Sequence, residues 1–137
     1  MMNITKTENL YIAATSSTPR VDFQFENHHL SLDGESYPEN ASSFYRPLIE
    51  QVEQYLAQLR EAEQILITEV HVSLVYFNSS STKMLFTLFD ILNKAASEGL
   101  SINFHWYADK EDDISQEFGE ELHADFQALN VHHHILE

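Results

Sequence analysis

The chain has 137 residues, of which 43% are hydrophobic, and this suits one folded domain with a single core. Its 22 acidic and 7 basic residues give a formal net charge of −15, which disfavours nucleic acid and anionic membranes as partners. The absence of cysteine excludes disulfides, thiolate catalysis and cysteine-bound metals. The N-terminus lacks a signal-peptide core and the longest apolar stretch, residues 65–77, is too short to span a bilayer, so we expect a cytoplasmic protein.

The first quarter of the chain predicts a short strand followed by a β-hairpin. Residues 9–15 are typical of a short strand that ends at a polar segment. Apolar and polar residues then alternate over residues 21–26 and again over residues 30–33, on either side of a short polar turn. Period-two alternation on both sides of a turn predicts two antiparallel strands.

Three later segments have the spacing of apolar residues that predicts helices. The first covers residues 44–62, and we expect Pro47 in its first turn because proline lacks the N–H that later turns require. The second covers residues 82–99 and stops at Gly99. The third covers residues 114–126, with an apolar stripe that consists of Ile114, Phe118, Leu122 and Phe126.

Strands are predicted between and after these helices. Residues 65–77 are nearly continuous in apolar and β-branched residues, which predicts a central strand covered on both faces. Residues 100–107 and 128–136 form two further strands. The order β-β-β-α-β-α-β-α-β implies right-handed crossovers and a mainly parallel sheet, with the hairpin as its antiparallel part. We therefore expect one mixed α/β domain over residues 1–137.

Four consecutive hydroxyl residues, 79–82, follow Asn78 where a predicted strand gives way to a predicted helix. A helix N-terminus has free N–H groups and the positive end of the helix dipole. One hydroxyl at this place can cap the helix, and the same geometry also stabilises a phosphate. The residues alone leave both interpretations open, a helix cap and a phosphorylated switch.

Two motifs, GESYPEN at residues 34–40 and YFNSSSTK at residues 76–83, resemble the SiaC family of regulatory phosphoproteins. These are small bacterial proteins with a fold similar to STAS domains and anti-sigma-factor antagonists, and the resemblance extends from Thr18 to the last strand. It implies partner switching. A dedicated protein kinase phosphorylates the hydroxyl after the asparagine, a PP2C-like phosphatase removes the phosphate, and the unmodified protein activates a diguanylate cyclase, which raises cyclic di-GMP and promotes biofilm formation.

Carried onto this sequence, the resemblance makes Ser79 the phosphoacceptor and Ser80 the second choice. The family commonly has threonine where Ser79 stands. The residues around the acceptor that would support the site are Asn78, Ser80, Ser81 and Lys83.

The first motif is expected to flank the serine run. If the strand around Leu32 and the strand that ends at Phe77 are parallel, both following loops emerge at one edge of the sheet, where open α/β sheets usually bind ligands. A second interpretation is structural, with Asn40 or Ser42 as a helix cap, Pro38 as a stiff element and Tyr37 in the core. The residues expected to bind a partner are Glu35, Ser36, Tyr37, Pro38, Glu39 and Asn40.

Histidines and acidic residues invite a metal hypothesis, which the sequence does not favour. Residues 132–134 are histidines in a predicted strand, so neighbouring side chains point to opposite faces and cannot hold one ion together. His28 and His29 lie in a predicted turn. We expect surface or edge-strand histidines, a solvated acidic loop at residues 109–113, and no metal or cofactor.

Two alternative functions remain beside the switch. One is a metal-dependent small hydrolase that uses the acidic and histidine-rich loops. The other is a STAS-like scaffold without a covalent modification.

Overall fold

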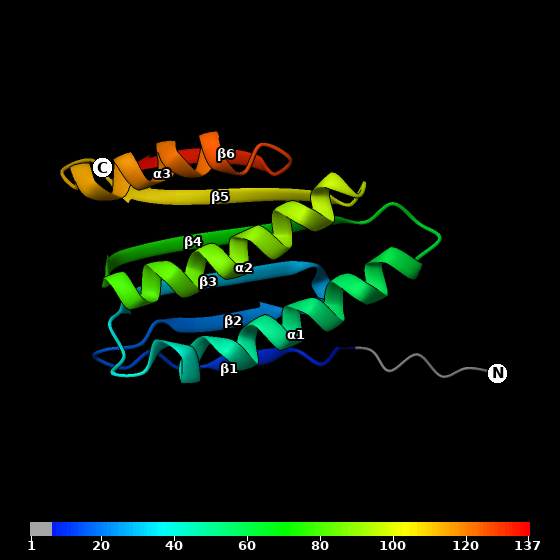
Figure 1. Cartoon of the computed structure of the whole chain (residues 1–137), viewed down its shortest axis with the longest axis horizontal. Helices are drawn as coiled ribbons and strands as arrows, with labels where there is room; N and C mark the ends of the chain where they lie inside the picture. Colours follow the sequence, from blue (N-terminus) through cyan, green and yellow to red (C-terminus); the bar gives the residue numbers. More distant parts are fainter. Residues whose placement is uncertain (1–6) are drawn as a thin grey trace.

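A computed structural model describes residues 7–137, which form one α/β domain around a six-stranded sheet (Figure 1). The strands lie side by side in chain order from β1 to β6. Pairing is antiparallel between β1, β2 and β3, and parallel from β3 to β6. The strands are β1 (Leu10–Ile12), β2 (Arg20–Gln24), β3 (His29–Ser36), β4 (Ile67–Phe77), β5 (Ser101–Asp109) and β6 (Asn130–Leu136).

The predicted hairpin and the predicted order of elements are confirmed. Strands β2 and β3 pair with Val21 opposite Leu32, and a short 3₁₀ helix, η1 (Phe25–Asn27), joins them. The described residues contain three α-helices, α1 (Ala41–Glu61), α2 (Ser79–Ser97) and α3 (Asp113–Asp125). None of the helices in this part of the chain is long and apolar enough to cross a membrane.

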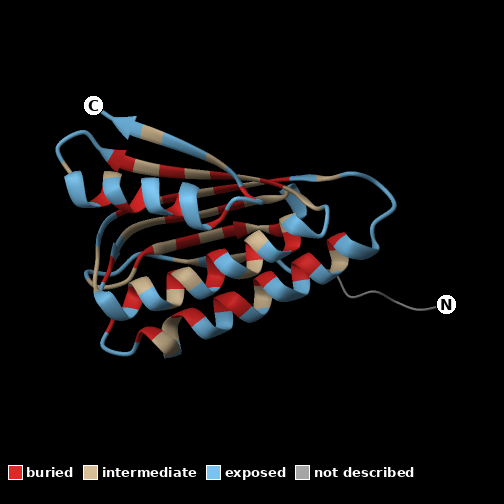
Figure 2. Ribbon diagram, turned by 45° about the horizontal axis from the view of Figure 1, so that its top comes forward, coloured by how far each residue is buried: buried red, intermediate tan, exposed pale blue. Residues whose placement is uncertain are grey.

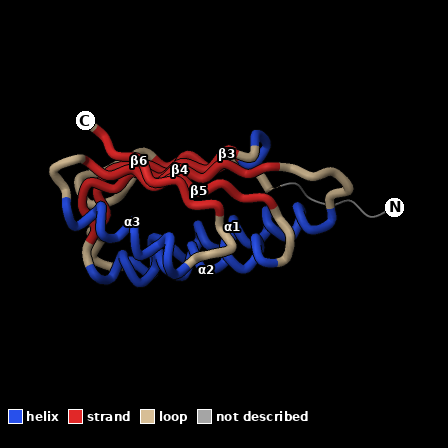
Figure 3. Tube along the Cα trace, turned by 90° about the horizontal axis from the view of Figure 1, so that it is seen from above, coloured by secondary structure: helices blue, strands red, loops and turns tan. Residues whose placement is uncertain are grey.

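All three helices cover the same face of the sheet (Figure 3). Strands β3 to β6 follow one another in a single direction across the sheet, so each right-handed crossover places its helix on the same side. Strand β4 is central as predicted, but the expectation that both its faces are covered is wrong. Its residues Val70 and Val72 are buried beneath the helices, whereas Glu69 and His71 on the opposite side are only half-buried. We call this uncovered side the open face of the sheet.

The core lies between the sheet and the inner sides of the helices, as the alternation of buried and exposed residues in Figure 2 shows. The predicted stripe of α3 is correct except at Ile114, whose side chain is 76% exposed. Ser115 is buried instead, and its carbonyl accepts a hydrogen bond of 2.8 Å from the indole N–H of Trp106.

The limits of the helices correct one prediction and confirm another. Pro47 lies in the second turn of α1 and not in the first, because the helix already begins at Ala41. The missing proline N–H leaves the carbonyl of Ser43 without its intrahelical donor, and Ser43 and Pro47 both lie on the exposed side of the helix. Gly99 ends α2 as predicted. Its φ of 108° suits glycine, and the N–H groups of Gly99 and Leu100 donate to the carbonyls of Ala96 and Ala95.

Candidate functional site

Strands β3 and β4 bring the two sequence motifs together at one edge of the sheet. The strands are parallel as predicted, with Ser36 opposite Phe77 at their ends. The N–H of Asn78 donates to the carbonyl of Ser36 at 3.0 Å, which continues the pairing by one step beyond β4. The loop after β3 and the first turn of α2 therefore start from adjacent points.

Gly34 makes this alignment possible. The register between β3 and β4 shifts between Gly34 and Glu35, so that Glu35 lies opposite Tyr76. Gly34 has a φ of 119°, a conformation that other residues adopt only with strain. The glycine that opens the GESYPEN motif is thus explained by a β-bulge that sets the position of Ser36.

Three buried hydroxyl groups join the motifs and α1, and we call Ser36, Tyr45 and Ser81 the hydroxyl cluster. The Ser36 hydroxyl donates to the Ser81 oxygen at 2.8 Å, and the Ser81 hydroxyl donates to the Ser36 carbonyl at 3.0 Å. Since the Ser36 proton is already used, Tyr45 must be the donor in its 2.5 Å bond to the Ser36 oxygen. Burial raises the pKa of Tyr45 to about 12, so its hydroxyl remains a donor.

The serine run divides into a buried residue and two exposed ones. The helix cap is Asn78, whose side-chain oxygen accepts the N–H of Ser81 at 2.9 Å. Ser81 is fully buried, while Ser79 and Ser80 are exposed at the first two positions of α2. Within residues 7–137, neither the Ser79 nor the Ser80 hydroxyl has a hydrogen-bond partner. Capping is thus performed by Asn78 and not by the serines.

The residues of the first motif alternate between burial and exposure. Ser36 and Pro38 are buried. Asn40 caps α1, because its side-chain oxygen accepts the N–H of Ser43 at 3.0 Å. Tyr37 does not fill the core as the structural interpretation expected; its side chain is 39% exposed and contacts Tyr76 edge-to-face at 5.5 Å between ring centres. The two motifs therefore share an exposed aromatic pair. Glu35 and Glu39 of the first motif and Lys83 of the second are also exposed.

The acidic loop behaves as predicted. The side chain of Asp112 caps α3 by accepting the N–H of Ser115 at 3.0 Å, and Asp109 accepts the N–H of Glu111 at 2.9 Å. Asp109 and Asp112 thus each accept one backbone N–H, in the loop and at the start of α3.

The alternation predicted for residues 132–134 is also found. His132 and His134 stack on His105 on the open face, whereas His133 lies against Gly119 of α3. Sequence reasoning did not foresee that His71, His105 and Glu69 also meet there. Among the described residues, these three are the one group whose geometry suits a metal ion. The period-two spacing of Glu69 and His71 indicates that both side chains lie on one face of β4. It does not show that His105 lies beside them, because that depends on the pairing of β4 with β5.

Three of these side chains have shifted pKa values. Burial lowers the pKa of His71, and the neighbouring His105 and His29 lower it further. Burial also lowers the pKa of His134, with His105 adding to the effect. Burial acts to raise the pKa of Glu69, but hydrogen bonds from Asn103 and His105 outweigh it, so that the pKa is lowered overall.

The edge formed by the two motifs combines exposed hydroxyls with an exposed aromatic pair. A serine nucleophile requires a base within hydrogen-bond reach, and the described structure places none beside Ser79 or Ser80. What it offers is a rigid first turn, fixed by Asn78 and the hydroxyl cluster, with exposed hydroxyls and an aromatic pair next to it. Exposed hydroxyls at a fixed helix start are the arrangement in which the helix N-terminus stabilises a phosphate, as in proteins regulated by phosphorylation.

Comparison with known proteins identifies the family. The family model described as "SiaC family regulatory phosphoprotein" matches residues 12–136. An uncharacterized protein of Pseudomonas aeruginosa strain UCBPP-PA14 is 32% identical over 117 residues, which are 85% of this chain and 89% of the relative. The chain therefore belongs to the SiaC family of regulatory phosphoproteins, and it is a regulator and not an enzyme. The hydrolase alternative is set aside.

Solved structures of Pseudomonas aeruginosa SiaC have the same fold. In the crystal structure of the diguanylate cyclase SiaD with its activator SiaC, the matching chain is 28% identical, with a TM-score of 0.82 over 93% of this chain and 99% of that one. The crystal structure of apo-SiaC is 29% identical, with a TM-score of 0.78 over 94% of this chain and 98% of the other.

Proposed function

We propose that this chain is a cytoplasmic partner-switching protein which binds and activates a diguanylate cyclase when unphosphorylated and releases it when Ser79 is phosphorylated. Membership of a family of regulatory phosphoproteins supports the modification, and the similarity to the SiaC activator supports the cyclase as partner. A cognate protein kinase and a PP2C-like phosphatase would add and remove the phosphate. Cyclic di-GMP, and with it biofilm formation, would be the output.

The observation that carries the proposal is the exposure of Ser79 on a fixed first turn of α2. Its hydroxyl is accessible to a kinase, in contrast to that of Ser81, which is fully buried and bonded to Ser36. The N–H groups at the helix start and the helix dipole favour a phosphate at this place. A phosphate there changes the charge of the surface without disturbing the hydroxyl cluster below.

Lys83 lies within reach of a phosphate at the start of α2. It is exposed, four residues after Ser79 and three after Ser80, and both spacings place side chains on the same side of a helix. A phosphate on either serine would pair with this lysine one turn away. The choice of Ser79 therefore rests on its place directly after Asn78 in the second motif.

The partner surface in this proposal joins the serine turn with the loop after β3. The exposed pair Tyr37 and Tyr76 supplies apolar contact area, and Glu35 and Glu39 add negative charge around it. A complementary cyclase surface would be apolar with a basic rim. Ser36, Pro38 and Asn40 serve this surface by holding the loop in place.

The proposed site is tested by locating the phosphate. The purified chain is incubated with its cognate kinase and ATP, and intact-mass and fragment analysis count and assign the phosphates. We expect one phosphate on Ser79, its loss in Ser79→Ala, and its retention in the matched variant Ser80→Ala. A phosphate found only outside residues 79–82 would overturn the assignment.

A further inference from the structure

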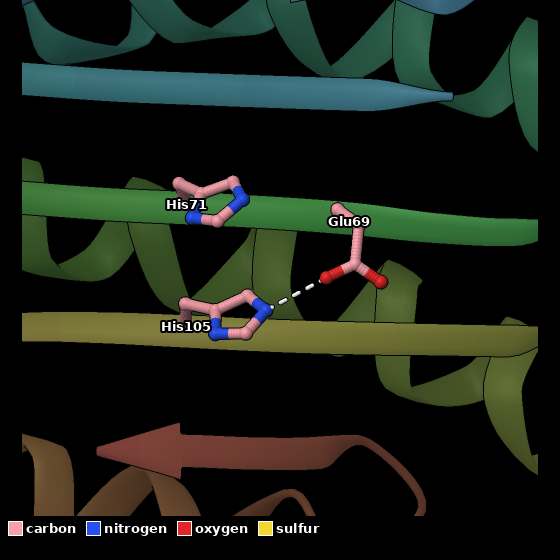
Figure 4. Close-up of side chains that lie close together, drawn as sticks. All are labelled: Glu69, His71 and His105. Carbon is pink, nitrogen blue, oxygen red and sulfur yellow. Dashed lines mark hydrogen bonds and ion pairs between the residues drawn. The ribbon is translucent and has the colours of Figure 1, made fainter. Parts of the chain in front are cut away.

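Three metal-ligating side chains converge on the open face, away from the serine turn (Figure 4). Glu69 and His71 are two residues apart on β4 and so point to the same side, and His105 lies on β5 directly beside His71. One donor atom from each residue lies within 4.8 Å of the other two. Figure 4 shows a ring nitrogen of each histidine turned toward the carboxylate of Glu69.

Each of the three side chains, Glu69, His71 and His105, also has a further side-chain hydrogen-bond partner. Such outer partners are typical of metal sites, where they fix the orientation and the tautomer of the ligands. Here Asn103 donates to Glu69 Oε2 at 2.6 Å, the Tyr107 hydroxyl lies 2.8 Å from His71 Nδ1, and His134 Nε2 lies 2.9 Å from His105 Nδ1.

The outer partners leave the Nε2 atoms of both histidines as the available donors. With Nδ1 of His71 and of His105 engaged, each ring presents Nε2 toward Glu69. His105 Nε2 is already 2.8 Å from Glu69 Oε1, and this hydrogen bond contains the proton that a cation would displace.

A tetrahedral zinc ion requires a small movement of these side chains. Its bonds to nitrogen and oxygen are about 2.0–2.2 Å, so neighbouring donor atoms come to about 3.4 Å apart. The rings of His71 and His105 are stacked with 4.5 Å between centres and 6° between planes, and they must tilt for both lone pairs to meet one ion. The three side chains are half-buried on the face that no helix covers. Because His71 also stacks on His29 and His105 on His132, the tilt must shift those neighbouring rings as well.

We propose that Glu69, His71 and His105 bind one divalent cation of the zinc type on the open face, with water as the fourth ligand. Two imidazoles and one carboxylate are a ligand set that zinc accepts, and imidazole nitrogen selects against magnesium and calcium. The chain's net charge of −15 adds a general attraction for cations. This site differs from the sequence-based expectation of no metal, and it is independent of the proposed switch at Ser79.

The test is calorimetric titration of the untagged, chelator-treated chain with Zn²⁺ alone. We expect one equivalent of Zn²⁺ to bind to the wild type, and we expect His105→Ala and Glu69→Gln each to abolish this binding. Tyr107→Phe, which removes only the outer partner of His71, should weaken binding about tenfold. The matched control is His123→Ala, because His123 is exposed on α3, on the other side of the sheet, and its loss should change nothing.

Nuclear magnetic resonance of the wild-type histidine rings gives a second readout that does not depend on a variant's folding. Zn²⁺ should shift the ring signals of His71 and His105 in parallel with the calorimetric transition and leave those of His123 in place. The proposal is overturned if Zn²⁺ does not bind, or if several weak equivalents bind without regard to His105→Ala and Glu69→Gln. It is equally overturned if the shifts fall on histidines outside the group.

Discussion

The exposed serines at the start of α2 and the buried hydroxyl cluster beneath them use the same residue type for opposite purposes. Ser79 and Ser80 make no side-chain hydrogen bond within the described chain, whereas Ser81 is fully buried and bonded to Ser36. Two positions along a helix are enough for this difference, because successive residues lie about 100° apart around the axis. Within one run of hydroxyl residues, the buried Ser81 thus holds the first turn of α2 in place, while Ser79 and Ser80 remain accessible at the surface.

The largest effect on stability is expected at Ser36. Ser36→Ala removes the acceptor of the buried Tyr45 hydroxyl and one of the partners of Ser81, so it should lower the free energy of unfolding by about 2–3 kcal/mol. Denaturant unfolding measures this value, with Ser80→Ala as the control. A loss no greater than that of the control would mean that the cluster does not hold the site together.

Removal of the helix cap should have the next largest effect. Asn78→Ala leaves the buried N–H of Ser81 without its side-chain acceptor, which should lower the free energy of unfolding by about 1–2 kcal/mol. Thermal melting should record the loss, and Asn78→Asp should restore most of it because aspartate also caps helices. Equal melting of the alanine variant and the wild type would contradict the assignment of Asn78 as the cap.

Tyr45→Phe should lower the free energy of unfolding by about 1 kcal/mol at neutral pH. The loss is smaller than for Ser36→Ala because Ser36 keeps its hydrogen bond to Ser81. The variant should also be less sensitive to alkali. The folded pKa of Tyr45 is about 12 and the ordinary value is 10.0, so the wild type loses stability as the pH rises from 10 toward 12, where only the unfolded chain ionises. Unfolding curves at increasing pH should show a shallower decline for the variant, and parallel curves would contradict a protonated, buried Tyr45.

The smallest effect is expected for the exposed serines. Ser79→Ala and Ser80→Ala remove no hydrogen bond and no buried atom, so each should change the free energy of unfolding by no more than about 0.5 kcal/mol. Circular dichroism melts of the two variants would check this. A large loss of stability in Ser79→Ala would show that Ser79 has a structural role and would count against its proposed role as the phosphorylated switch.

Most of the fold could be predicted from the sequence because its patterns are local. Alternation gave the hairpin, helical spacing gave the three helices, and Gly99 marked the end of α2. The errors arose where a long-range contact decides the outcome. Ser115, whose carbonyl accepts the Trp106 indole N–H, is buried in place of Ile114, and strand β4 has one uncovered face because every crossover goes to the same side.

The candidate site was only partly predictable for the same reason. The parallel arrangement of β3 and β4 followed from the order of elements, and it places the motifs together. Which serine is buried depends on the bulge at Gly34 and on the phase of α2, neither of which the sequence states directly. The meeting of His71 with His105 depends on the pairing of β4 with β5.

Phosphorylation is expected to oppose binding although the added charge should attract a basic partner. A dianion inside a close-packed interface brings a desolvation cost of several kcal/mol, whereas a screened surface attraction contributes about 1 kcal/mol or less. The cost dominates only if Ser79 lies within the contact. Weaker binding after phosphorylation would therefore indicate that Ser79 lies inside the contact with the partner, and tighter binding would indicate that it lies outside.

The most direct test of the switch is calorimetric titration of the cognate diguanylate cyclase with the unmodified and the Ser79-phosphorylated chain. We expect the unmodified protein and Ser79→Ala to bind with similar affinity, and the phosphorylated protein and Ser79→Asp to bind at least about tenfold more weakly. Ser80→Asp serves as the matched charge control. Equal or tighter binding by the phosphorylated protein would contradict the account.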